Sequence, residues 1–309
     1  MYSFIQKIRA QFATQAATTS GINRPIAATG ERQLRFNLPA PEIIAGLRSD
    51  IGCRRQVNED SCRFVKPNEA ETLARKGLLL LVADGMGGHV GGQIASRSAV
   101  EVISRVYYEG GDDIAAALRA AFLQANRAIH QQAEQDKNLT GMGTTCTALV
   151  LHNGFAYCAH IGDSRLYLVR DGQIYLMSED HSAVMEMVRR GLLTLEKARH
   201  HEDKNVILRA LGTQPKVEIS VWDKPFPVQA GDQFVLCSDG LYDLVEDEEI
   251  KHAVLQTAPE VACEHLIALA LQRGGHDNIT VGVLRVEAKD NNAIRTAPPT
   301  RELVQYGER

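Results

Sequence analysis

The sequence predicts an α+β fold in which antiparallel β-sheets pack together and pairs of helices lie outside them. Three observations predict it. Two consecutive helices follow the first strands, four strand-like runs joined by hairpin turns come next, and two more helices precede the last strand. Because the helices come in pairs and do not separate each strand from the next, this order argues against a parallel sheet of alternating strands and helices.

The first strands and helices occupy residues 64–135. Phe64–Val65 and Leu78–Val82 are short apolar runs on either side of a polar insert, which predicts two strands joined by a loop. After a glycine-rich stretch, small and apolar residues from Ala95 to Val106 recur at helical spacing, and so do those of residues 112–135. These two segments are therefore predicted to be amphipathic helices.

The middle of the chain changes to the period of strands. The turn signals His152-Asn153-Gly154 and Asp171-Gly172 each separate two apolar, branched runs, which predicts two hairpins. The four predicted strands are Thr145–Leu151, Phe155–His160, Arg165–Arg170 and Gln173–Met177. Four antiparallel strands in succession indicate a single meander.

The remaining part of the chain contains a predicted flap and the last elements of the sandwich. Residues 181–206 are charged and helical in propensity but are bounded by strands, which indicates a flap inserted over one end of the sheet. The elements predicted beyond it are strands near 217–222 and 233–238, helices at about 247–256 and 259–273, and a last strand over Ile279–Val286.

Composition separates one folded domain from two tails. Residues 1–44 are rich in Ala, Thr, Gln and Pro and are predicted to be a mostly disordered N-terminal arm. Residues 45–287 are predicted to form a single domain, and residues 288–309 a polar C-terminal tail. The net charge of −4 gives no reason to expect nucleic acid or an anionic membrane as a partner.

Two further features bear on the location of the protein. No apolar run approaches the ~20 residues needed to span a bilayer, and the N-terminus lacks the apolar core of a signal peptide. The six cysteines are scattered without a CxxC pair, so they are predicted to be small buried residues in a reducing compartment. We therefore expect a cytoplasmic protein without a transmembrane segment, and a monomer.

Acidic residues recur where predicted strands meet loops. The residues in such positions are Glu59, Asp60, Asp84, Asp163, Asp239 and Asp277. Carboxylates that lie close together raise one another's pKa and destabilise the fold unless cations accompany them. Ligand sets made only of oxygen are those that Mg²⁺ and Mn²⁺ prefer. A turn or a cap is the usual role of one loop aspartate, but the recurrence predicts a divalent metal site.

Other phosphate and metal chemistries lack their sequence signals. The chain has no Gly-Lys dipeptide, hence no Walker A loop, and the glycine that would complete GxGxxG after Gly85 and Gly87 is replaced by Val90. It has no HExxH motif and no Cys/His spacing suited to zinc. The glycine loop is therefore predicted to bring the backbone close to a metal ion.

Six short motifs occur in order between Arg48 and Val286. They are Arg55-x-x-Asn58-Glu59-Asp60, Asp84-Gly85-Met86-Gly87-Gly88, Gly143-Thr144-Thr145, Ile161-Gly162-Asp163-Ser164-Arg165, Ser238-Asp239-Gly240-Leu241 and Gly275-x-Asp277-Asn278-Ile279-Thr280. Each is weak alone, but in this order and spacing they resemble the bacterial branch of the metal-dependent (PPM, type 2C) serine/threonine protein phosphatases. The resemblance implies a two-sheet β-sandwich with helix pairs on both outer faces (αββα).

The resemblance also implies a metal-ligand set. Asp84 would bridge two metal ions, Mn²⁺ or Mg²⁺. Asp239 and Asp277 would complete the first site, and Glu59 and the carbonyl of Gly85 would complete the second.

Three further residues receive roles from the same resemblance. Asp60 would hold metal-bound water, Arg55 would grip the substrate phosphate, and Asp163 would bind a third, weaker ion. The implied activity is hydrolysis of phosphoserine and phosphothreonine in proteins by a hydroxide that bridges two ions, reversing the action of a protein kinase.

Some points stay open at this level. Animal members of the family carry a histidine after the Asp-Gly pair as a proposed general acid, whereas this chain has Met86, and His89 and His181 are only weak substitutes. A phosphatase fold that binds phosphoproteins without catalysis, or one that hydrolyses small phosphoesters, is an alternative. The presence of every expected metal-binding aspartate argues against a non-catalytic protein.

Overall fold

The computed structural model describes residues 42–87 and 91–288 of the 309-residue chain. Nearly all of the predicted N-terminal arm, residues 88–90 of the glycine loop and almost the entire predicted C-terminal tail lie outside the described residues. No helix within the described ranges is both long enough and apolar enough to cross a membrane.

The strands form two main antiparallel sheets. Sheet A has the order β1-β13-β12-β8-β9, and sheet B has the order β10-β7-β6-β3-β2 with β11 also paired to β7. A short ribbon pairs β4 with β5. The strands are β1 (Glu42–Asp50), β2 (Ser61–Val65), β3 (Leu78–Ala83), β4 (Gly85–Met86), β5 (Gly143–Thr144), β6 (Cys146–His152), β7 (Phe155–Ile161), β8 (Arg165–Arg170), β9 (Gln173–Leu176), β10 (Ser220–Val221), β11 (Phe226–Pro227), β12 (Gln233–Cys237) and β13 (Ile279–Glu287).

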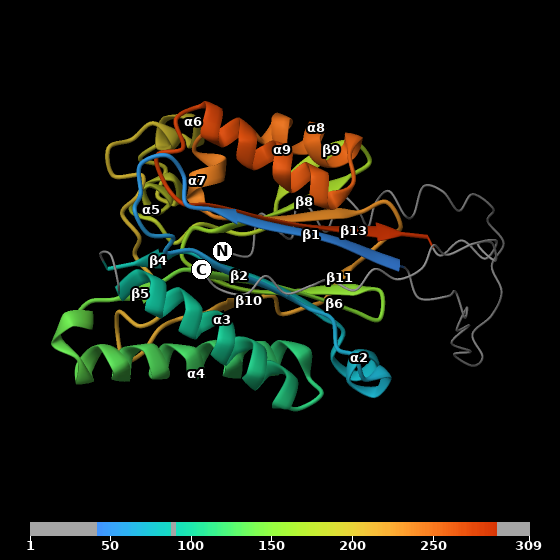
Figure 1. The fold of residues 1–309 in the computed structure, drawn as a ribbon, viewed down its shortest axis with the longest axis horizontal. Helices are drawn as coiled ribbons and strands as arrows, with labels where there is room; N and C mark the ends of the chain where they lie inside the picture. Colours follow the sequence, from blue (N-terminus) through green and yellow to red (C-terminus); the bar gives the residue numbers. More distant parts are fainter. Residues whose placement is uncertain (1–41, 88–90, 289–309) are drawn as a thin grey trace, which may run out of the picture.

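Helices cover both outer faces of the two sheets. The helices are α2 (Ala70–Lys76), α3 (Gly91–Glu109), α4 (Ile114–Gln135), the 3₁₀ turn η1 (Lys137–Leu139), α5 (Ala183–Arg189), α6 (Leu195–Arg199), α7 (Asp239–Tyr242), α8 (Asp247–Gln256) and α9 (Pro259–Gln272). In Figure 1, α8 and α9 lie over sheet A, and α3 and α4 lie over sheet B. The α+β sandwich predicted from the sequence is thus confirmed.

Three layers of buried apolar side chains hold these four layers together. One lies between sheet B and helices α3 and α4, one between the two sheets, and one between sheet A and helices α7 to α9. All six residues of β3 are buried, because this strand lies inside sheet B with apolar layers on both faces. The ends of such a strand are fixed by the core, which makes β3 a rigid support for Asp84.

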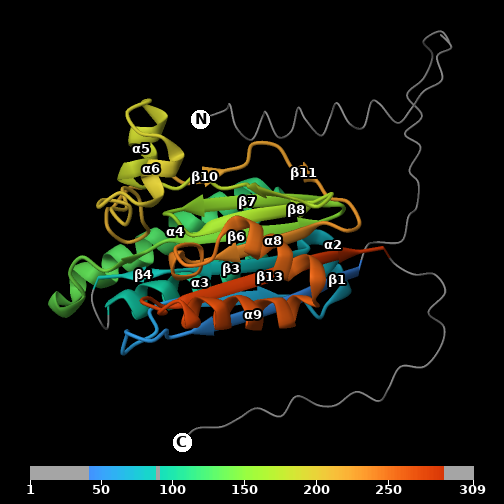
Figure 2. The same cartoon turned by 90° about the horizontal axis from the view of Figure 1, so that it is seen from above.

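The flap joins the two sheets. Helices α5 and α6 lie between β9, at the edge of sheet A, and β10, at the edge of sheet B. They lie at the same end of the molecule as β4 and β5 (Figures 1 and 2). Ser182 and Thr194 cap these two short helices by accepting hydrogen bonds from backbone N–H groups.

Three predicted segments differ in the structure from what the sequence indicated. The predicted meander is wrong, because β6 and β7 form a hairpin in sheet B while β8 and β9 form one in sheet A. The chain therefore crosses between the sheets over residues 162–164. The polar insert after β2 contains a helix, α2, and the strand predicted near 217–222 is reduced to Ser220–Val221.

Strand β1 was not predicted and begins inside the predicted arm. It pairs with β13 along all nine residues, and Ile43, Ala45 and Leu47 pack against the layer between the sheets. Because β1 is an edge strand with mostly half-buried or exposed residues, its alternation of apolar and polar side chains is weak.

Candidate active site

The structure gathers the predicted acidic residues at one end of the sandwich. Asp84 lies between β3 and β4, Asp239 is the first residue of α7, and Asp277 lies two residues before β13. The charges of Asp239 and Asp277 both raise the pKa of Asp84, so the three carboxylates lie close enough to interact. We call Glu59, Asp60, Asp84, Asp163, Asp239 and Asp277 the acidic cluster.

Burial and mutual repulsion dominate the electrostatics of the acidic cluster. Burial, and then the charges of Asp60 and Asp239, hold the pKa of Asp84 well above its usual range. Burial raises the pKa of Asp60 to about 7, although hydrogen bonds from Thr280 and Ser238 oppose this shift. The pKa of Asp239 rises to about 6 through burial and the charge of Asp277. Without added cations, the cluster therefore retains protons near neutral pH.

Some buried oxygen atoms of the cluster have no hydrogen-bond partner among the described residues. Oδ1 of Asp60 and Oδ1 of Asp239 are among them. As the side chains stand, no three histidine, cysteine or acidic groups of the described residues are placed to hold an ion together. An all-oxygen donor set with orphaned carboxylate oxygens nevertheless has the chemistry that a hard divalent cation requires. The residues therefore fit Mg²⁺ or Mn²⁺.

Glu59 and Asp60 are fixed by residues that sequence reasoning assigned no role. Glu59 and Asp60 are each 7% exposed, and Asn278 accepts a hydrogen bond from the Glu59 backbone N–H at 2.8 Å. The Ser238 hydroxyl donates to Asp60 Oδ2 at 2.8 Å and accepts from the Thr280 N–H at 3.0 Å. The sequence did offer a signal for these supporting residues, because they lie within the same motifs as the aspartates: Ser238, Asn278 and Thr280.

Gly85 is required by the close approach of three backbone segments. A Cβ atom at this position would collide with the carbonyl oxygen of Gly92 and would lie 2.6 Å from that of Glu59. The Gly85 N–H also donates to the Glu59 carbonyl at 3.2 Å. Glycine therefore lets the segment that contains Asp84 pack directly against the segment that contains Glu59.

Arg55 lies at the edge of the acidic cluster. Its Nη2 donates to Asp277 Oδ2 at 2.6 Å, and its Nη1 lies 3.7 Å from Glu59 Oε2. The hydrogen bond to Asp277 is the main cause that raises the pKa of Arg55. Because 45% of the side chain is exposed, the guanidinium can also meet a ligand from solvent.

Asp163 lies in the turn where the chain crosses between the sheets. The residue is 4% exposed, and burial followed by the charge of Asp239 holds its pKa well above the usual range. Ser164, next to it, exchanges a 2.6 Å hydrogen bond with Thr145, whose hydroxyl also accepts from the Asp84 N–H at 3.0 Å. The structure therefore places Asp163 in the cluster and ties its turn to the backbone of Asp84.

Two histidines, His89 and His181, were considered from the sequence as weak candidates for the proton donor. His89 lies outside the described residues. His181 is 8% exposed, and burial lowers its pKa to about 2, so it is neutral at ordinary pH. A neutral imidazole that holds no extra proton is a poor general acid.

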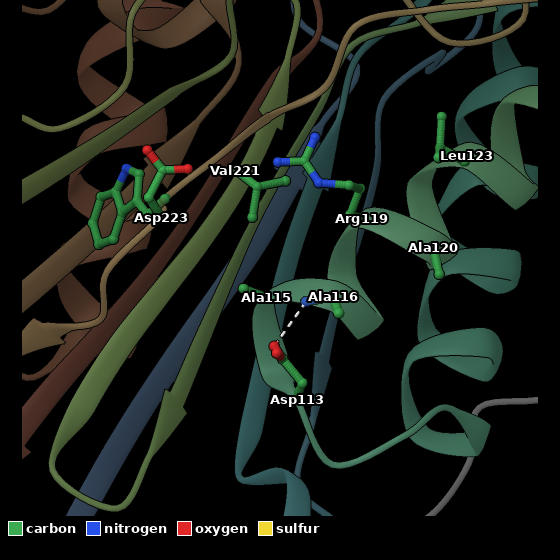
Figure 3. A pocket seen from close by; sticks show the side chains of 9 residues that line it. Asp113, Ala115, Ala116, Arg119, Ala120, Leu123, Val221 and Asp223 are labelled. Atoms are coloured by element: carbon green, nitrogen blue, oxygen red, sulfur yellow. Dashed lines mark hydrogen bonds between the residues drawn. The ribbon is translucent and has the colours of Figure 1, made fainter. Parts of the chain in front are cut away.

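Two open cavities of the described residues bear on the location of the site. One, of about 340 Å³, is lined by residues that include Asp60, Ser49 and Arg97. The other, of about 420 Å³, lies between the first half of α4 and the segment around β10 (Figure 3). It contains Arg119 and Asp113 but no member of the acidic cluster, and Asp113 there accepts from the Ala116 N–H as the cap of α4. Chemistry and not cavity size therefore identifies the site.

The sequence profile described as protein phosphatase 2C matches residues 54–266, a range that contains most of the acidic cluster. The chain belongs to the protein phosphatase 2C family. The serine/threonine protein phosphatase PstP of Mycobacterium tuberculosis is 41% identical over 242 residues, which cover 77% of this chain and 44% of that protein. The chain thus spans less than half the length of this relative.

A second relative and a crystal structure of part of PstP support membership of the protein phosphatase 2C family along most of the fold. The serine/threonine phosphatase stp of Listeria monocytogenes is 36% identical over 244 residues, covering 77% of this chain and 93% of that protein. A crystal structure of the catalytic domain of PstP with two manganese ions has a TM-score of 0.67 at 37% identity, covering 79% of this chain and 98% of that one.

Proposed function

We propose that this chain is a metal-dependent serine/threonine protein phosphatase whose acidic cluster binds Mn²⁺ or Mg²⁺. The observation that carries the proposal is the buried group of mutually repelling carboxylates, with orphaned oxygens at Asp60 and Asp239, beside the accessible guanidinium of Arg55. The named activities of the relatives at 41% and 36% identity support it.

The proposed ligand roles follow the positions of the carboxylates. Asp84, whose pKa is raised by the charges of both Asp239 and Asp277, would be shared by two ions. Asp239 and Asp277 would complete one site, and Glu59 with the carbonyl of Gly85 the other. The two ions in the PstP crystal structure agree with this number.

Two further members of the acidic cluster have outer roles in this proposal. Asp60, buried and held by Ser238, would accept a hydrogen bond from water at the site. Asp163, close enough to Asp239 for their charges to interact, would offer a third, weaker ion one carboxylate.

The proposed reaction is the in-line hydrolysis of a phosphate ester by hydroxide. When bound, the ions would lower the pKa of water and offset charge on the phosphoryl oxygens. Arg55 would bind two of these oxygens through its guanidinium, after exchanging its contact with Asp277 for the substrate. Charge stabilisation of this kind is the main requirement of phosphoryl transfer.

The proposed substrates are phosphoserine and phosphothreonine in proteins, and the proposed role is to oppose a protein kinase. The alternative of a non-catalytic phosphoprotein-binding module is weakened because every predicted metal-binding carboxylate is present. Hydrolysis of a small phosphoester would use the same cluster, so only substrate preference separates it from the proposal.

One assay tests the proposal directly. Hydrolysis of a phosphothreonine peptide is measured during titration with Mn²⁺, with a chelator as control and phosphorylated metabolites as competing substrates. We expect Mn²⁺-dependent turnover that favours the peptide. Turnover unaffected by the chelator would contradict the metal site, and preference for a metabolite would replace the protein substrate.

A matched pair of arginine variants tests the phosphate-binding role. Arg55→Ala is expected to raise KM for the peptide by roughly tenfold to a hundredfold, because a charge-assisted hydrogen bond is lost. Arg54→Ala is the control, since Arg54 is the exposed neighbouring arginine and does not fit the motif that contains Arg55. Equal KM values for the two variants would contradict the role of Arg55.

A further inference from the structure

The root of the flap is tied to the turn that carries Asp163 through one histidine. His181 Nδ1 accepts a hydrogen bond from the Gly162 N–H at 3.1 Å, and the His181 N–H donates to the Gly162 carbonyl at 2.7 Å. Both polar backbone groups of Gly162 are therefore bonded to one residue. The His181 carbonyl also accepts from the Leu208 N–H at 2.7 Å, which joins the two ends of the flap.

The turn at Gly162 has little conformational freedom. Its φ of +103° lies in a region that favours glycine, and a Cβ atom there would lie 2.5 Å from Cβ of Thr145. Thr145 thus packs directly against the turn. Without its hydrogen-bonding partner, the buried Gly162 N–H would also be left with an uncompensated desolvation cost.

The turn is connected to Asp84 through Thr145. Thr145 exchanges a side-chain hydrogen bond with Ser164, accepts from the Asp84 N–H, and donates its own N–H to the Asp84 carbonyl at 2.8 Å. A continuous path of hydrogen bonds and packed atoms therefore runs from His181 to the residue at the centre of the acidic cluster.

The imidazole of His181 has a defined tautomer. The Gly162 N–H can only donate, so Nδ1 carries no proton and Nε2 carries it. Nε2 then donates to the Ser220 hydroxyl at 2.9 Å, on β10. The ring also packs at a tilt against His160, with the two centroids 4.9 Å apart. Both nitrogens are thus used to hold three parts of the chain in one arrangement.

We infer that His181 is a positioning residue, which fixes the Gly162–Asp163 turn against Thr145 and thereby sets the places of Asp163 and Asp84 in the acidic cluster. The inference rests on the proposed function for its effect on catalysis, but its structural part stands separately. Residues that orient metal ligands without contacting the metal typically contribute roughly 10- to 100-fold to metal affinity or activity.

Two substitutions separate the two nitrogens of the ring. In His181→Asn the shorter side-chain amide reaches the position of Nδ1 and can still accept from Gly162. In His181→Gln the longer amide reaches the position of Nε2 and can bond only Ser220. Ser220→Ala, which removes the Nε2 contact alone, is the control. All three variants leave the residues of the acidic cluster unchanged.

Four measurements are made on the full chain: kcat and KM for a phosphothreonine peptide, the Mn²⁺ dissociation constant by calorimetry, and hydrogen exchange of the Gly162 amide by NMR. For His181→Gln we expect kcat lower and the dissociation constant higher by roughly tenfold to a hundredfold, KM within about twofold, and faster Gly162 exchange. His181→Asn and Ser220→Ala are expected to stay within about threefold of the original protein in kcat and Mn²⁺ affinity.

The outcomes distinguish this inference from the proposed function. Equal losses in His181→Asn and His181→Gln, or unchanged Gly162 exchange in His181→Gln, would overturn the positioning role. If the original protein hydrolyses no phosphopeptide, the proposed function fails, while the exchange and calorimetry data still decide the role of His181.

Discussion

Charged side chains are buried in two places of this sandwich, in one as a pair of opposite charges and in the other as a group of like charges. Arg170 and Asp232 are 3% and 1% exposed, and they form a two-pronged ion pair in which both N–O distances are 2.6 Å. Asp232 also accepts from the Gln229 N–H at 2.7 Å. In the acidic cluster, by contrast, Asp60 and Asp239 each keep a buried oxygen without a partner, and carboxylates raise one another's pKa.

The comparison shows in which of the two places the buried charge is offset by other groups of the protein. In the Arg170–Asp232 pair the two opposite charges offset each other, so the pair needs no partner from solution and contributes to the fold. A group of buried like charges costs folding free energy that the chain itself does not recover. The proposed binding of a divalent cation, the partner that these oxygen atoms suit, would offset this cost.

The largest expected effect comes from removing one carboxylate of the cluster. Asp239→Asn is expected to lower Mn²⁺-dependent hydrolysis of a small aryl phosphate by at least about 10³-fold, because a metal ligand and its charge are lost. In the presence of a chelator the variant should be at least as stable as the original protein, since a repelling charge has been removed. Turnover and thermal unfolding check the two parts.

The outcome that would break the comparison is a variant with normal turnover or with a lower unfolding temperature in chelator. Normal turnover would show that the site lies elsewhere. Lower stability would show that Asp239 contributes to the fold in the manner of Asp232.

The next effect concerns the ion pair. Asp232→Asn leaves the Arg170 guanidinium buried without its counter-charge, and we expect a loss of about 3–5 kcal/mol in the free energy of unfolding. Turnover per folded molecule should not change, because the pair lies outside the acidic cluster. Urea unfolding and an active-site titration at low temperature measure these quantities, and a loss below about 1 kcal/mol would contradict the assignment.

The sequence could predict the cluster because strand ends fix side chains. Asp84, Asp239 and Asp277 each adjoin a buried apolar run, and runs that enter one core bring their ends together. The layer order was predictable for the same reason, since periodicity shows which faces are buried. The roles of Asp84, Asp239 and Asp277 as metal ligands stay predictions.

Other features were not predictable because they depend on contacts between distant segments. The half-exposed edge strand β1 gains its structure from pairing with β13, not from its own pattern. At the point where the chain crosses between the sheets, Gly162 packs against the distant residue Thr145. The local sequence around Gly162 fits a continuous meander equally well, so it does not show the crossing. The pair of Arg170 with Asp232 joins residues 62 positions apart that no local pattern relates.

The smallest expected effect comes from a buried group that avoids charge altogether. His160 is 3% exposed, and burial lowers its pKa to about 4 from an ordinary value near 6.5. Above pH 6.5 the residue is neutral in both folded and unfolded protein, so it causes no pH dependence. As the pH falls from 6.5 to about 4, the unfolded chain takes up the proton first, and stability falls by up to about 1.4 kcal/mol per pH unit.

His160→Gln removes this titration while an amide can still reach the Glu179 carbonyl, and the carboxylate contributions are common to both proteins. The difference in unfolding free energy between the two should therefore shrink by that slope on acidification, and parallel curves would show that His160 is protonated in the folded state.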